Sequence, residues 1–260
     1  MKGAAVRGRV TMMGSGTSSG VPVINCRCPV CTSDHPRNRR TRAGLKLEFP
    51  QGTLLVDTPT ELRLQCLEHG LERVDGVLFT HAHADHIFGL DDLRIFNFHQ
   101  GQNIPCYGSR ATLEALARTF AYAFEDGQLG GGKPRLELVP IDGLFEAAGV
   151  DILPVPVLHG ALEVTAFRIG DFAYVTDCSE IPPASRDLLA GVDVLILGAL
   201  RYHRHPTHFS MSEAIEAARD LEARHTIFTH LAHEVDYSRP EIALPAGMEL
   251  GYDGLVLELG

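Results

Sequence analysis

One short stretch of the sequence gathers side chains that bind metal ions. Residues 77–89 read VLFTHAHADHIFG, in which His81, His83, Asp85 and His86 follow an apolar segment. Imidazole and carboxylate ligands suit Zn, Mn or Fe, and the hard carboxylate oxygen favours a hydrolytic metal. Side chains at i, i+2, i+4 and i+5 do not converge on one ion, so the spacing predicts two neighbouring ions, with His81 and His83 facing one and Asp85 and His86 the other. Two ions can hold a water nucleophile and polarise a phosphoryl or acyl oxygen; the alternative is a solvated histidine-rich loop.

Three further candidate ligands come at the ends of apolar segments that predict β-strands. His159 follows residues 151–158, Asp177 follows FAYVT, and His230 follows residues 226–229. Side chains at the ends of strands are held on rigid elements, which suits a metal site. Asp177 has two oxygens and can bridge two ions. The predicted dinuclear site therefore has seven ligands: His81, His83, Asp85, His86, His159, Asp177 and His230.

A second metal site is predicted from the cysteines. Cys26, Cys28 and Cys31 lie in the segment CRCPVC. Three thiolates so close together suit a metal in a reducing compartment better than a disulfide framework. A closed tetrahedral zinc site needs one more ligand, and His233, three residues after His230, is the preferred candidate, with His35 as the competitor. A closed Cys3His site has no open position, which predicts a structural zinc that joins the N-terminal and C-terminal loops.

Alternating strands and helices must position these loops. Strands are expected at 8–13, 45–49, 53–56, 77–80, 104–107, 136–140, 151–158, 165–169, 172–176, 192–197, 226–229 and 252–259, and helices at 59–72, 90–98, 110–125 and 211–224. Thr58 is the expected N-cap of the first helix, and Ser210 with Glu213 predicts a capping box for the last one. Asp57, at the end of a strand, is expected to orient a neighbouring loop.

Several other segments carry weaker signals. The loop GSGTSSG, 14–20, predicts either an anion-binding turn or a plain turn. The basic stretch 34–42 predicts a surface loop, and the glycine-rich stretch 126–134 predicts a mobile loop. No chemical role is predicted for a last group of residues: His69, His99, His203, His205, His225 and the core cysteines Cys66, Cys106 and Cys178.

Composition narrows the classes of protein. The 260 residues are 45% hydrophobic, which predicts one globular domain spanning 1–260. No apolar run reaches the roughly 20 residues of a membrane span, and the N-terminus lacks the apolar core of a signal peptide, so a cytoplasmic protein is expected. The net charge of −10 argues against binding to long nucleic acid, whereas a small anionic substrate is compatible with bound cations. A homodimer is plausible for an enzyme of this size.

The whole pattern resembles a known family. THAHADH is similar to the HxHxDH signature of the metallo-β-lactamase superfamily, and GSGTSSGVP, CxCxxC, His159, Asp177, His208 and THLAH together resemble its PhnP-like phosphoribosyl cyclic phosphodiesterases. The resemblance implies that His81, His83 and His159 hold one ion, that Asp85, His86 and His230 hold the other, and that Asp177 bridges them. It also implies manganese or a similar divalent metal, and a substrate-facing His208 that acts as proton donor. Asp85 and His208 are thus the expected catalytic pair.

These observations lead to one expected fold and function. The fold is an α/β, four-layer αββα sandwich with the site at one edge. The function is metal-dependent hydrolysis of a small phosphodiester, with a cyclic ribose phosphate as the preferred class, at two Mn²⁺ or Zn²⁺ ions beside one structural Zn²⁺. The alternatives are an acyl hydrolase (lactonase or thioesterase) on the same ions, a tRNA 3′-end nuclease, a zinc-organised binding protein without turnover, and an iron-dependent oxidase. The segment 110–134 leaves the substrate open.

Overall fold

Two β-sheets form the centre of the molecule. The computed structural model describes residues 6–125 and 132–260, and each sheet has seven strands. The first sheet runs β14 (Val256–Leu259), β1 (Gly8–Gly14), β2 (Gly44–Phe49), β3 (Gly52–Val56), β4 (Gly76–Leu78), β5 (Ile104–Gly108) and β6 (Leu136–Pro140). The second runs β13 (Met248–Leu250), β12 (His225–Thr229), β11 (Val194–Gly198), β10 (Phe172–Val175), β9 (Leu162–Ile169), β8 (Val150–His159) and β7 (Phe145–Ala147).

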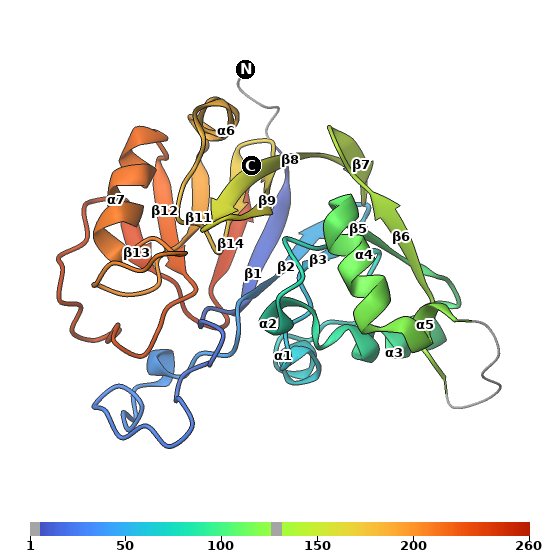
Figure 1. The fold of residues 1–260 in the computed structure, drawn as a ribbon, viewed down its shortest axis with the longest axis horizontal. Coiled ribbons are helices and arrows are strands. Elements are labelled where there is room, and N and C mark those ends of the chain that lie inside the picture. The colour runs from blue at the N-terminus through green and yellow to red at the C-terminus, as the bar shows by residue number, and fades with distance from the viewer. Residues whose placement is uncertain (1–5, 126–131) are drawn as a thin grey trace.

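Helices cover the outer face of each sheet (Figure 1). The first sheet carries α1 (Leu62–Glu68), α2 (Ala84–Ile87), α3 (Leu93–Gln100), α4 (Arg110–Thr119) and α5 (Ala121–Phe124), and the second carries α6 (Pro183–Leu189) and α7 (Met211–Asp220). Short 3-10 turns occur at Pro36–Asn38 and Leu90–Asp92. Among the described residues, every helix is too short or too polar to cross a membrane.

Alternation along the strands produces the four layers. In β10, Phe172 and Tyr174 point between the sheets, whereas Ala173 and Val175 pack beneath α6 and α7. The first sheet follows the same rule, because Leu54 faces the second sheet and Leu55 faces the helices. Successive strand side chains point to opposite faces, so strands that are apolar on both faces must lie inside a sandwich. The expected αββα architecture is confirmed.

The structure corrects several expected elements. The helix expected at 110–125 is interrupted at Phe120, whose φ of −112° and ψ of 41° leave the helical region. The helix expected at 59–72 spans only α1, and Thr58 is not its cap: its Oγ1 instead donates to the carbonyl of Ile87 at 3.2 Å, at the end of α2. The capping box of Ser210 and Glu213 on α7 is confirmed.

Other differences arise from contacts between distant parts of the chain. The stretch 34–42 is not wholly a surface loop, because Asn38 and Arg40 are 1% and 2% exposed. The elements α2, α6, β7 and β13 were not expected, since each is too short to show a period in the sequence. Most of the glycine-rich stretch expected to be mobile, residues 126–131, lies outside the described residues.

Candidate active site

The candidate ligands lie where strands of both sheets end. Asp57 directly follows β3, His81 follows β4, and Asp177 and His230 follow β10 and β12. The strands β3 and β4 are parallel, as are β10, β11 and β12, so their carboxyl ends meet at one edge of the sandwich. Asp57, Asp177 and His230 have φ angles of 63°, 46° and 58°. This left-handed region is uncommon for non-glycine residues and recurs at functional sites.

The first group of candidate ligands joins three elements. The ligand atoms of His81, His83, His159 and Asp177 all lie within 4.8 Å of one another. His81 and His83 come from the loop after β4, and His159 is the last residue of β8. The Oδ2 atom of Asp177 lies 3.6 Å from Nε2 of His81 and 3.9 Å from Nε2 of His159.

The second group shares Asp177 with the first. Asp85, His86, Asp177 and His230 also have ligand atoms within 4.8 Å of one another. Nε2 of His230 lies 3.1 Å from Oδ1 of Asp177, and Nε2 of His86 lies 3.5 Å from Oδ2. The two oxygens of Asp177 therefore face both groups. The structure brings together all seven residues predicted for the dinuclear site.

Hydrogen bonds fix which ring nitrogen faces the groups. Asp57 accepts from the backbone N–H of Thr80 and from its hydroxyl, both at 2.8 Å, and from Nδ1 of His86 at 2.7 Å. Because the Thr80 hydroxyl donates to Asp57, it accepts from Nδ1 of His81 at 3.0 Å. Nδ1 of His159 donates to the carbonyl of Thr207 at 2.6 Å. In each ring Nε2 is left with a lone pair, as in carboxylate–histidine–metal arrangements, and Asp57 orients the loop as the sequence predicts.

A third group lies apart from the first two. The Sγ atoms of Cys26, Cys28 and Cys31 lie 3.3, 3.5 and 3.5 Å from Nδ1 of His233. Four ligands about 2.3 Å from a tetrahedral zinc lie about 3.8 Å apart, so this spacing suits zinc. Despite burial, the N–H of Cys31 and the neighbouring side chains lower the pKa of the Cys28 thiol to about 7. His35, the competing fourth ligand, instead caps a 3-10 turn through Arg37.

The peptide that carries His230 and His233 is held on both sides. Leu231 donates to the carbonyl of Ser15 at 2.9 Å and accepts from the N–H of Thr17 at 3.2 Å. The buried guanidinium of Arg40 donates to the carbonyls of Ala232 and Val235, at 3.1 and 2.7 Å. Three more N–H groups of the GSGTSSG loop also bond within the protein: Ser15 donates to Asp253, Gly16 to Thr41 and Gly20 to Thr17. These bonds favour the plain-turn interpretation of this loop over the anion-binding one.

His208 covers the two groups of ligands. Its ring stacks on His230, with centroids 4.9 Å apart and planes at 16°, and meets the edge of His159 at 4.5 Å. Burial, together with the electrostatic influence of the neighbouring His230, lowers the pKa of His208 to about 3. This pKa favours the neutral ring in the free site, and proton donation by His208 to a bound substrate stays a prediction.

Comparison with known proteins identifies the family. A model of the Beta-lactamase superfamily domain matches residues 53–231, more than half of the chain. The chain belongs to the metallo-β-lactamase superfamily. This hydrolase is also PhnP-like, since it is 39% identical to a crystal structure of a diphosphatase from the PhnP family, with a TM-score of 0.91 and 97% of each chain covered. It is a metal-dependent hydrolase.

Two further relatives extend the comparison. The hydrolase is 32% identical, over 95% of its length, to an octanoyltransferase of Porphyromonas gingivalis, but it spans only 51% of that longer protein. It also shares its fold with Zn²⁺-bound PqqB from Methylobacterium extorquens, at 20% identity and a TM-score of 0.76 over 96% of this chain and 99% of that one.

The charges of the hydrolase fit bound cations. Ligands must be neutral imidazoles or ionised carboxylates. Burial lowers the pKa of His81 well below its usual value, and the neighbouring histidines outweigh burial to hold the pKa of Asp177 well below its own. Nε2 of His81, His86 and His230 are buried and form no hydrogen bond within the described residues. The carboxylates of Asp177 and Asp57 outweigh burial and raise the pKa of His86, which shows that its surroundings favour positive charge.

Two residues of this site, Thr207 and His205, were not predicted from the sequence. Thr207 holds His159 through its carbonyl, and His205 lies beside His208 with ring centroids 5.1 Å apart. The segment HPTH contains both residues, but its histidines follow no apolar strand, so no periodicity marked them. His69 and His225 lie elsewhere, bonded to the carbonyl of Met13 and to Glu249.

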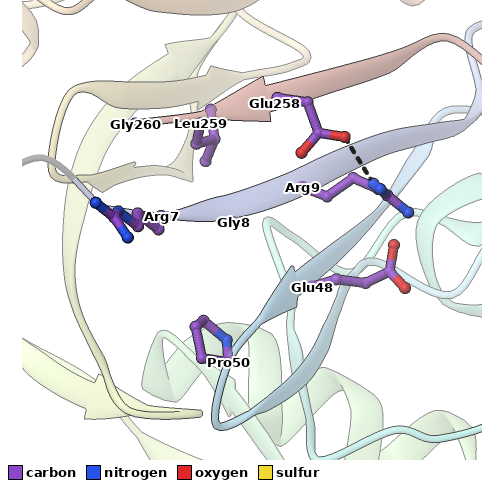
Figure 2. Close-up of a pocket in the computed structure, with 8 residues that line it drawn as sticks. All are labelled: Arg7, Gly8, Arg9, Glu48, Pro50, Glu258, Leu259 and Gly260. Carbon is purple, nitrogen blue, oxygen red and sulfur yellow. Dashed lines mark hydrogen bonds and ion pairs between the residues drawn. The ribbon is translucent and has the colours of Figure 1, made fainter.

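A separate hollow lies at the opposite end of the first sheet. Figure 2 shows it between the start of β1 and the end of β14, lined by Arg7, Arg9, Glu48 and Glu258 among others. Arg9 is bonded to Glu258 at 2.9 Å, so the charges there largely balance. This hollow therefore offers no excess of charge for an ionic substrate, and the candidate ligands lie at the other end of the sheet.

Proposed function

We propose that this hydrolase cleaves a small phosphodiester, of the cyclic ribose-phosphate class, at a dinuclear metal centre. One observation carries the proposal: two four-residue groups of ligand atoms share Asp177, and His208 lies directly over them. A shared carboxylate between two sets of imidazoles suits a pair of divalent cations.

Each residue has a proposed role. His81, His83 and His159 hold one ion, Asp85, His86 and His230 hold the other, and Asp177 bridges them. Such ions supply Lewis-acid activation of water and neutralise charge on phosphoryl oxygens. Asp57, Thr80 and Thr207 keep His86, His81 and His159 in the tautomer that leaves Nε2 free. The three cysteines and His233 hold a structural zinc.

His208 is proposed to act on the leaving oxygen. The neutral ring has one N–H with which to donate a hydrogen bond, and the negative charge of a bound phosphodiester favours the protonated form. Proton donation by His208 stays a prediction, because its surroundings lower the pKa in the free site. A His208→Gln variant keeps a hydrogen-bond donor but no titratable proton. Activity near wild type in His208→Gln, measured with an alkyl leaving group, would contradict proton donation.

A diphosphate is the second candidate substrate. The observation that favours it is the PhnP-family diphosphatase, which is 39% identical to this chain. A phosphoanhydride presents the same phosphoryl oxygens to the two ions, so the arrangement of the ligands is compatible with both classes. The difference between them lies in the leaving group, which is a sugar oxygen in one and a phosphate in the other.

One set of assays tests the proposal. Purified protein loaded with Mn²⁺ or Zn²⁺ is given bis(p-nitrophenyl) phosphate, a cyclic ribose phosphate, a sugar diphosphate and a lactone, with metal content measured in parallel. Diester turnover that is lost in Asp177→Ala supports the proposal. Turnover of the diphosphate alone moves the function to the second candidate, and turnover of the lactone alone moves it to acyl hydrolysis.

A further inference from the structure

His205 has no role in the proposed dinuclear centre, yet it lies at the rim of that site. Its ring is half-buried and tilted by 53° against His208, with centroids 5.1 Å apart. His208 in turn lies against His159 and His230. The rings therefore form a series that leads outward from the candidate metal ligands, and His205 is its outermost member.

Thr207 fixes the tautomer of His205. The backbone N–H of Thr207 points to Nδ1 of His205 at 3.3 Å, and the Thr207 hydroxyl lies 3.2 Å from the same atom. Because Nδ1 accepts from the backbone, the hydrogen of the neutral ring resides on Nε2. Within the described residues Nε2 of His205 has no hydrogen-bond partner, so its N–H can donate a hydrogen bond to a ligand at the rim of the site.

The loop that carries this donor is held in place. Gly160, at the turn between β8 and β9, has a φ of 63°, and a Cβ there would lie 2.8 Å from the Thr207 side chain. The Thr207 carbonyl meanwhile accepts from Nδ1 of His159. Thr207 thus connects His205 to a candidate metal ligand, which sets the position of the Nε2 donor relative to the reacting phosphate.

We propose that His205 binds the substrate, donating a hydrogen bond from Nε2 to an oxygen of the sugar that carries the leaving oxygen. The proposal rests on the proposed function, in which His208 faces the leaving oxygen. In a cyclic ribose phosphate the leaving oxygen stays on the sugar, so further oxygens of that sugar are within a few bonds of the atom that His208 would face. His205 is the ring that lies next to His208, which makes it the candidate donor to one of these oxygens. An aryl diester has no oxygen at that distance from the bond that breaks.

Two substitutions separate substrate binding from support of Thr207. In His205→Asn the amide oxygen replaces the Nδ1 acceptor, whereas in His205→Gln the amide nitrogen replaces the Nε2 donor. We expect His205→Asn to lower kcat/KM for 5-phosphoribosyl 1,2-cyclic phosphate by about 5- to 10-fold, mainly through KM, as for loss of one hydrogen bond between neutral groups. We expect His205→Gln to stay within about threefold of wild type.

Controls make each outcome decisive. For bis(p-nitrophenyl) phosphate both variants should match wild type, and His203→Ala, at an exposed position on the same loop, should match it for both substrates. Metal content should be unchanged in all of them. Equal losses on both substrates, or loss in His205→Gln with none in His205→Asn, would overturn the proposal, because His205 would then act through Thr207.

The same experiment separates the two levels of inference. If wild type hydrolyses the aryl diester but not the cyclic sugar phosphate, the sugar contact is wrong while diester hydrolysis stands. If wild type hydrolyses neither diester, the proposed function fails and this inference fails with it.

Discussion

Replacing Asp57 by Asn tests how the site controls its imidazoles. Asp57 is 1% exposed and accepts three hydrogen bonds, two from Thr80 and one from Nδ1 of His86. Asn has nearly the same shape and tolerates the φ of 63° at this position better than most residues do. Asp57→Asn therefore removes an acceptor and leaves the backbone in place.

The expected effect follows from the position of the new NH2 group. If the amide oxygen keeps the Thr80 N–H, the NH2 faces Nδ1 of His86, which must then accept and carry its own hydrogen on Nε2. A ring with hydrogen on Nε2 cannot bind a metal there. Loss of such a supporting carboxylate lowers metal affinity by about 10- to 100-fold, or about 1.4 to 2.7 kcal/mol. The loss should fall mainly on the ion held by Asp85, His86 and His230.

The assay is a competition titration with a chelator, using Mn²⁺ or Co²⁺, that resolves the affinities of the two ions. Asp75→Asn is the matched control, because Asp75 accepts from the Thr53 N–H at 2.9 Å near the other end of β3 and does not contact the candidate ligands. If Asp57→Asn binds both ions as tightly as wild type and Asp75→Asn, the tautomer argument is wrong.

Three further predictions test other parts of the molecule. Cys28→Ser should lower the zinc content by one ion per chain. It should also lower the melting temperature more than chelation of the dinuclear site does, since zinc binding in such sites contributes folding free energy on the order of 10 kcal/mol. A melting temperature of Cys28→Ser equal to that of wild type would contradict a structural zinc. Ser210→Ala should cost about 1 kcal/mol in urea unfolding at neutral pH. The part that comes from the Ser210 hydroxyl donating to the Glu213 carboxylate should be present above about pH 4.5 and be lost as the pH falls through the lowered pKa of Glu213, whereas the bond from the Glu213 backbone N–H to the hydroxyl should keep its contribution at every pH. Gly160→Ala should destabilise the chain by about 1 to 2 kcal/mol, because the φ of Gly160 is 63°. It should also lower metal affinity, because the new Cβ would displace Thr207, which holds His159. A metal affinity equal to that of wild type would show that the turn does not position His159.

The αββα architecture and the clustering of the candidate ligands could both be predicted from the sequence, whereas the boundaries of many elements could not. Metal ligands belong to a few residue types, so the segment from His81 to His86 and the cysteine segment could be recognised from their spacing. Asp177 could be recognised from its position at the end of an apolar strand, taken together with these segments. Asp57 could be predicted because a carboxylate at the end of an apolar strand has few other uses. The buried Arg40 could not, because its partners are the backbone carbonyls of Ala232 and Val235, which have no sequence signature.

The boundaries of elements failed for a similar reason. The break at Phe120 has no proline or glycine to announce it; the ring packs instead against Phe88, with centroids 6.3 Å apart, so tertiary packing decides where α4 ends. Short elements such as α2 depend on tertiary contacts that form only in the folded chain. One of these is the hydrogen bond from Thr58 to the carbonyl of Ile87, the last residue of α2. His205 could not be predicted because its proposed role depends on which ring nitrogen carries the hydrogen. The Thr207 N–H decides this, and that contact has no signal in the sequence.

The joining of the N-terminal and C-terminal loops has a consequence for synthesis of the protein. Cys26 and His233 are 207 positions apart, and Ser15 pairs with Leu231. A chain that grows from its N-terminus exposes three thiols long before their fourth partner exists. Neither group that includes the THLAH peptide can be completed until residues 230–233 have been synthesised. Metal loading is therefore a late step of biogenesis, and the nascent thiols must be kept reduced until it occurs.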